Sequence, residues 1–162
     1  MKTRISLLFI VILFNAYKTL AQDEIQTVIA KFIISDASKN GYDITKYVLE
    51  NEVYTVFYTS GNDGHTYMAN VWPKSDSQSF GRLISVEHES FEETSENYAF
   101  DIFDFTWSYI NSYDKKRGTA KVQVVKIYKP LGVAFTLKIV SENLDIIIYK
   151  GFMEGSIDFN MF

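Results

Sequence analysis

The chain has 162 residues, no cysteine and a formal net charge of −4. An acidic protein gains nothing from counterion release at nucleic acid or at an anionic membrane surface, so neither is expected as a partner. Without cysteine there is no disulfide and no site for an N-terminal lipid, so the protein is not expected to be a lipoprotein. Packing alone must then stabilise the fold, and 13 Phe and 11 Tyr supply large apolar side chains for it.

The first 21 residues have the pattern of a secretory signal peptide. Lys2 and Arg4 precede the apolar run Ile5–Phe14, and small residues lead up to Ala21-Gln22, the expected cleavage site. The apolar run is about half the roughly 20 residues that a membrane span needs. An uncleaved N-terminal anchor or a buried helix is the alternative. The Leu-Ala-Gln junction resembles export cleavage sites common in Bacteroidota.

Cleavage leaves residues 22–162, which are expected to form one exported domain, periplasmic or extracellular. The mature chain is expected to have no transmembrane segment. Because residues 1–21 carry Lys2, Arg4 and Lys18 but no acid, the net charge falls from −4 to −7.

The sequence predicts a helix over Asp23–Lys39. Apolar residues recur there at i, i+3, i+4, i+7 and i+8, forming one stripe: Ile25, Val28, Ile29, Phe32 and Ile33. Asn40-Gly41 supplies a stop signal. A short second helix is predicted from Asp43 to about Leu49, although the same residues also alternate tolerably as a strand.

From Glu52 onward the apolar period changes to two. Strand-like runs rich in β-branched and aromatic residues alternate with turns; they are Val53–Thr59, His65–Trp72, Leu83–Ser90, Tyr98–Asn111, Thr119–Lys129, Val133–Val140 and Ile146–Met153. Pro73 should end the second run, and Lys74–Gly81 and Glu92–Asn97 are predicted to be loops.

The aromatic run Tyr98–Tyr109 changes its apolar face at Ile102–Phe103. A matching change occurs within Val122–Ile127 of the next predicted strand. A face change in a strand predicts a bulge or a sharp bend, and two paired strands that shift face together can share it as one kinked hairpin.

These elements predict an α+β fold, in which the N-terminal helix packs on a strongly curved antiparallel meander of about seven strands. The alternative is an up-and-down β-barrel, or a sandwich, with a helical cap.

Common catalytic and metal-binding motifs are missing from the sequence. There is no thiol, G-x-S-x-G, H-E-x-x-H, phosphate loop or dinucleotide fingerprint, and two histidines disfavour a zinc site. No metal site and no cofactor are therefore expected. The catalytic candidates are His88, Asp101 and Asp104, which would act as acid or base in a hollow. A core histidine and solvent-facing carboxylates account for the same residues.

Trp72, Trp107 and Tyr109 are the candidates for ligand binding. Sugar-binding modules stack exposed aromatic rings on pyranose faces, although aromatics at alternate strand positions are more often core. Burial of both tryptophans would exclude this interpretation.

The sequence favours a non-catalytic exported module that binds an unidentified protein or small ligand. The alternatives are a carbohydrate-binding module and a small cofactor-free lyase or isomerase with a His/Asp pocket. A hollow filled by the helix would favour protein–protein recognition on the outer surface, whereas an open hollow would favour a ligand.

Overall fold

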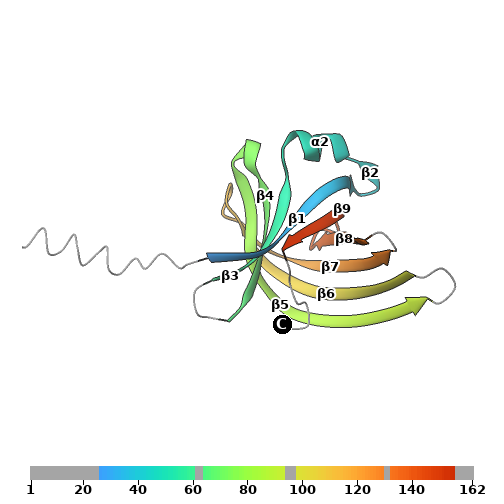
Figure 1. The fold of residues 1–162 in the computed structure, drawn as a ribbon. Coiled ribbons are helices and arrows are strands. Elements are labelled where there is room, and N and C mark those ends of the chain that lie inside the picture. Colours follow the sequence, from blue (N-terminus) through green and yellow to red (C-terminus); the bar gives the residue numbers. More distant parts are fainter. Residues whose placement is uncertain (1–25, 61–63, 94–97, 130–131, 156–162) are drawn as a thin grey trace, which may run out of the picture.

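The computed structural model describes residues 26–60, 64–93, 98–129 and 132–155 (Figure 1). The side chains of residues 26, 85–86, 88–93, 98 and 129 also lie outside the description. The predicted signal peptide falls on residues that are not described.

Nine strands and one α-helix make up this part of the chain. The strands are β1 (Gln26–Lys39), β2 (Tyr42–Asp43), β3 (Tyr54–Ser60), β4 (Thr66–Trp72), β5 (Ser77–Glu93), β6 (Tyr98–Asn111), β7 (Arg117–Lys129), β8 (Gly132–Ser141) and β9 (Ile146–Gly155). The α-helix is α2 (Thr45–Glu50), and a short 3-10 turn, η1, covers Pro73–Ser75.

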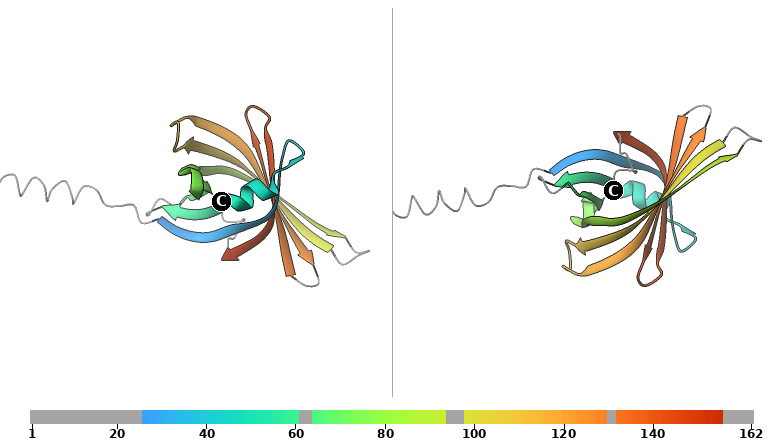
Figure 2. Two further views of the ribbon diagram at one scale, coloured as in Figure 1. Left: turned by 90° about the horizontal axis from the view of Figure 1, so that it is seen from above. Right: turned by 90° about the horizontal axis from the view of Figure 1, so that it is seen from below.

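The strands form a closed up-and-down barrel. The sheet order is β2-β1-β3-β4-β5-β6-β7-β8-β9, and β1 also pairs with β9, so that β1 and β3–β9 close an eight-stranded barrel with β2 as an extra strand. Figure 1 shows β5, β6 and β7 running side by side, and Figure 2 shows the hairpins splaying apart at one end. The alternative barrel prediction is therefore confirmed. The leading α+β prediction fits less well, because the antiparallel meander is present but the long N-terminal helix is not.

The predicted helix Asp23–Lys39 is the strand β1 over its described part. Its inward residues are Ala30, Phe32 and Ile34, which alternate and are buried, while Val28 is 60% exposed although it belonged to the predicted helical stripe. Bulges between Val28 and Ala30 and between Ile34 and Asp36 blur the two-residue period. The segment forms a strand rather than a helix because its backbone pairs on both edges, with β3 on one side and β9 on the other.

The short second helix is confirmed as α2, which lies against β1 at one end of the barrel (Figure 1). Val48 is its buried residue, and Ile44 just before it packs on the core. The Ala37 N–H donates to Thr45 Oγ1 at 2.9 Å, which joins the start of α2 to β1.

The predicted loop Lys74–Gly81 is largely strand. Pro73 does end β4, as expected, but after η1 the strand β5 already begins at Ser77. Of the other predicted loop, residues 92–93 belong to β5 and residues 94–97 lie outside the description.

The predicted bulge shared by β6 and β7 is not present. Their pairing runs without a shift from Ala99↔Tyr128 to Ile110↔Arg117. The shift lies instead in β5, between Leu83 and Val86. Phe103, Phe105 and Trp107 are buried at alternate positions, so an unbroken period places Phe100 and Ile102 on the outer face. The sequence shows an apparent change of the apolar face at Ile102–Phe103 because apolar residues also occupy the outer face of β6.

Two glycines lie where neighbouring strands approach most closely. A Cβ on Gly81 in β5 would lie 1.8 Å from the Ser108 carbonyl oxygen of β6, and a Cβ on Gly151 in β9 would lie 1.9 Å from the Ile33 carbonyl oxygen of β1. Glycine at such positions lets strands coil tightly enough to close a small barrel.

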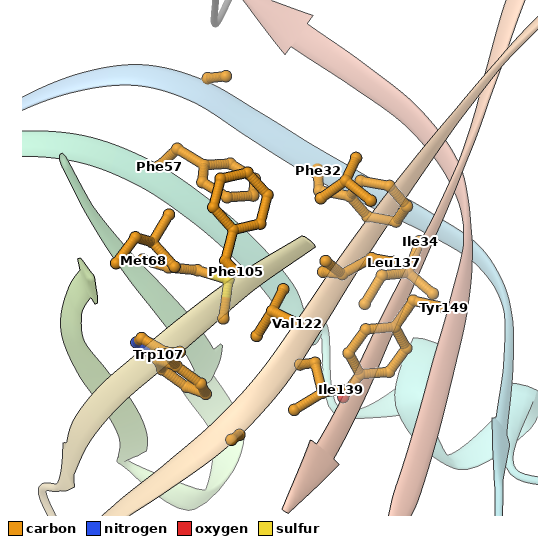
Figure 3. Packing of buried hydrophobic residues seen from close by; sticks show 14 of the residues in the cluster. Phe32, Ile34, Phe57, Met68, Phe105, Trp107, Val122, Leu137, Ile139 and Tyr149 are labelled. Carbon is orange, nitrogen blue, oxygen red and sulfur yellow. The ribbon is translucent and has the colours of Figure 1, made fainter. Parts of the chain in front are cut away.

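Side chains fill the centre of the barrel, as expected where eight strands leave little more than side-chain room. They converge from β1, β3, β4, β6, β7, β8 and β9 (Figure 3). The largest fully buried ones are Tyr149, Phe32, Phe57, Phe105, Met68 and Leu137.

Candidate functional site

The buried centre of the barrel contains a small polar group rather than a site open to solvent. The Asn70 side-chain amide donates to Tyr149 Oη at 3.3 Å, and both residues are buried. Burial raises the pKa of the Tyr149 phenol, and the hydrogen bond from Asn70 opposes that shift. Tyr149 is therefore a neutral core residue with one polar partner.

A hollow on the outer wall of the barrel is the candidate functional site. Strand pairing sets one row of residues across it: Tyr58 of β3 pairs with Tyr67 of β4, Tyr67 with Arg82 of β5, and Arg82 with Ser108 of β6. Tyr58, Tyr67 and Ser108 line the hollow, and Arg82 does not. The chain neighbours Phe57, Met68 and Trp107 belong to the core. Since side chains alternate along a strand, this row faces outward.

The hollow has a volume of ≈ 380 Å³ and a mixed lining. Its apolar and aromatic members are Tyr58, Tyr67, Phe80, Tyr109 and Ile110, and its polar members are Ser60, Ser108 and Arg117, with Gly81 between them. The Tyr58 and Tyr67 rings are stacked, with centroids 5.4 Å apart. Burial also raises the pKa of Tyr58. The hollow therefore combines aromatic faces with hydroxyl groups and one guanidinium group.

A second cross-strand row brings the cation to the hollow. Phe80 of β5 pairs with Ile110 of β6, and Ile110 pairs with Arg117 at the start of β7. Arg117 is exposed and also lines a neighbouring, more polar hollow that contains Asp114 and Glu142. The guanidinium group of Arg117 thus stands at the edge of the aromatic surface.

Tyr109 is the sequence candidate that lines this hollow, although it lies on the inner face of β6 with Trp107 and also packs against the core. Its hydroxyl group lies over Gly118 of β7, where an added Cβ would be 2.7 Å from the Tyr109 oxygen. Gly118 is the register partner of Tyr109, so the glycine makes room for the ring. Tyr109 lines both the aromatic hollow and its polar neighbour.

The two tryptophans lie elsewhere. Trp107 is 3% exposed, and its Nε1 donates to the Gly81 carbonyl oxygen at 3.2 Å. Trp72 is half-buried and packs against Tyr47 of α2, with ring centroids 5.8 Å apart. They form no planar exposed row, since one is core and the other contacts the helix.

The two candidate aspartates lie on opposite faces of β6. Asp104 is on the outer wall and accepts a hydrogen bond from Gln123 Nε2 at 3.1 Å. Asp101 shares the inner face with Phe103 and accepts from Tyr128 Oη at 2.8 Å. Opposite faces prevent the two carboxylates from sharing one pocket.

His88 is placed by its backbone alone, which pairs with Phe103 in β6. Its side chain lies outside the described part, so its role as a base stays a prediction.

Most of the hollow could not be recognised from the sequence. Tyr58, Tyr67, Phe80 and Arg117 come from four different strands, β3, β4, β5 and β7. Their alternation with apolar neighbours marks them as outward-facing only once the register is known.

Within the described ranges, no three His, Asp or Glu side chains are grouped so that they could hold a metal ion. No helix in those ranges has the length and hydropathy needed to cross a membrane. No protein-family model, curated protein or solved structure matches the chain.

Proposed function

We propose that this protein is an exported, non-catalytic binding module that takes a small ligand in the hollow on its outer wall. One contrast carries the proposal. The centre of the barrel is filled by fully buried side chains such as Phe32, Phe57 and Val122, whereas the outer hollow of ≈ 380 Å³ exposes aromatic and polar groups together. Ligand sites of this kind combine apolar walls with a few convergent polar groups.

Binding suits the hollow better than catalysis does. Its described lining has neither a carboxylate nor an imidazole, the groups that most often move protons near neutral pH. The lyase or isomerase alternative would need Asp101 or Asp104, and these lie on opposite faces of β6. The carbohydrate alternative loses Trp107 to the core, and within the hollow it depends on Tyr67 and Tyr109.

Ring compounds of different polarity test the site. Phenol, indole, benzoate and methyl glucoside are titrated into isotope-labelled protein while backbone amide shifts are followed by NMR. We expect the shifts to gather at Tyr67, Phe80 and Ile110. Phe80→Ala should weaken the binding, and Ile84→Ala, an exposed position on the same strand, should leave it unchanged. Shifts confined to the barrel ends, or none at all, would contradict the proposal.

Export is tested separately by the mature N-terminus. The pattern in residues 1–21 predicts that protein collected outside the cytoplasm begins at Gln22. Intact-mass measurement of the secreted chain checks this, and a chain that retains Met1 would contradict cleavage.

A further inference from the structure

We infer that the ligand of the hollow is a carboxylate carried on a ring, held by Arg117 while one face of the ring lies against the aromatic wall. This inference rests on the proposed function and names its ligand class. It begins with an unusual distribution of ion pairs.

Many exposed lysines of this acidic protein are paired with a carboxylate. The pairs are Lys39–Asp145, Lys46–Glu50, Lys74–Glu52, Lys116–Asp114 and Lys150–Asp36, with N–O separations from 3.2 to 3.9 Å. The arginines of the described chain are Arg82 and Arg117, and the side chain of neither forms an ion pair or hydrogen bond with another described residue. Both are exposed, and Arg117 lines the hollow whereas Arg82 does not.

Among the described residues Arg117 has no ion-pair partner, although two carboxylates line a hollow with it. Asp114 and Glu142 line the neighbouring polar hollow with it, yet Asp114 pairs with Lys116, and Glu142 accepts hydrogen bonds from the Thr119 backbone and hydroxyl group. The two acids that line this polar hollow with Arg117 are thus engaged elsewhere, which leaves its guanidinium group available to a ligand.

The chemistry of the lining selects the ligand. A guanidinium group binds a carboxylate through two parallel N–H donors, a fit that a lysine ammonium does not offer. Tyr67 and Phe80 supply aromatic surface on which a flat ring can pack, and Ser108 adds a hydroxyl group at the same edge. A charged end held next to an apolar body therefore matches the hollow better than a neutral sugar or a bare anion does.

Paired probes test this assignment. Benzoate and its neutral analogue benzamide, and glucuronate and its neutral analogue glucose, are titrated into the full-length mature protein at low salt. We expect the acid of a pair to bind about 10-fold or more tightly than its neutral analogue, because charge-assisted hydrogen bonds are the stronger kind. Tighter binding of benzoate identifies an aromatic acid as the source of the carboxylate, and tighter binding of glucuronate identifies a sugar acid.

Arg117→Gln should abolish the preference for the acid, with a loss of about 10-fold to 100-fold in its affinity. Lys121→Gln is the matched control, because Lys121 is an exposed cation on the same face of β7 that bonds Thr106 and does not line the hollow. An unchanged melting temperature in both variants shows that the fold is kept.

Two results would overturn the inference in distinguishable ways. Equal binding of benzoate and benzamide, unaffected by Arg117→Gln, excludes the carboxylate while leaving a ligand-binding hollow. If phenyl phosphate binds more tightly than benzoate and its binding depends on Arg117, the ligand group is a phosphate and the inferred carboxylate is wrong. If no ring compound shifts the amides of the hollow, the proposed function fails and this inference fails with it.

Discussion

At the scale of single residues, the closure of the barrel depends on glycines that have no space for a side chain. Gly151→Ala would place a Cβ 1.9 Å from a backbone oxygen of β1, which cannot move without breaking the ladder. We expect a loss of about 2 kcal/mol or more in the free energy of unfolding, the range of overpacked sites. Urea denaturation of the purified variant measures it.

Gly118→Ala is the control for that experiment. The nearest atom to its added Cβ is the hydroxyl oxygen of Tyr109, at the far end of a side chain that can rotate away. Gly118→Ala should lower the free energy of unfolding clearly less than Gly151→Ala does. Equal costs would show that loss of glycine flexibility, not the close approach of strands, sets the effect.

The raised pKa of Tyr149 should make the free energy of unfolding fall at alkaline pH. In the unfolded chain a tyrosine ionises near pH 10, whereas burial keeps the native phenol neutral to higher pH. Above pH ~10 the native state therefore binds more protons than the unfolded state, and this side chain lowers the free energy of unfolding by up to about 1.4 kcal/mol per pH unit. Its contribution is complete below pH ~10 and is lost as the pH rises through the native pKa.

Tyr149→Phe should flatten this alkaline decline, measured by urea unfolding at a series of pH values from about 9 to about 11. Tyr113→Phe, at a position 83% exposed, should keep the wild-type slope. A Tyr149→Phe curve parallel to the wild type would mean that the phenol is not desolvated in the native state.

Among the elements, β1 is the segment whose helix prediction and observed strand can be distinguished by substitution. Phe32 is fully buried and Val28 is 60% exposed, yet both belong to the stripe that a helix would bury. In the strand, Phe32→Ala should cost about 3–5 kcal/mol of unfolding free energy, whereas Val28→Ala should stay within about 0.5 kcal/mol. Thermal and chemical denaturation of the two variants measure the difference. Comparable losses would favour a helix.

The helical pattern was a reasonable interpretation of this segment but an incomplete one. The segment is rich in Ile, Val and Thr, which favour strands, and Ala30, Phe32 and Ile34 alternate within it. Periodicity alone did not decide, because apolar residues occupy both faces and bulges interrupt the alternation. The β-strands after β2, by contrast, were largely foreseen, since each lies between clear turn signals.

At the scale of the whole molecule, the seam between β1 and β9 converts a meander into a barrel. Lys31 and Glu154 are register partners across this seam. Because paired residues of antiparallel strands have Cβ atoms about 4.5–5.5 Å apart, the double variant Lys31→Cys/Glu154→Cys should form a disulfide on mild oxidation. The natural chain has no cysteine, so any disulfide observed is the engineered one.

Mass spectrometry of peptides under non-reducing conditions detects that crosslink. Lys31→Cys combined with Asp104→Cys is the control, because β6 is not a neighbour of β1 in the sheet order. Crosslinking of the control pair but not of the seam pair would contradict a closed barrel.

The aromatic supply of the core, most strand positions and the short helix can be predicted from the sequence, because they depend on local periodicity and turn chemistry. That β1 is a strand follows from the fold alone, because its partner β9 lies at the other end of the chain and its pairing with β3 spans the helix α2. The same holds for the hollow. Tyr58, Tyr67, Phe80 and Arg117 become neighbours through strand register, which no local pattern specifies.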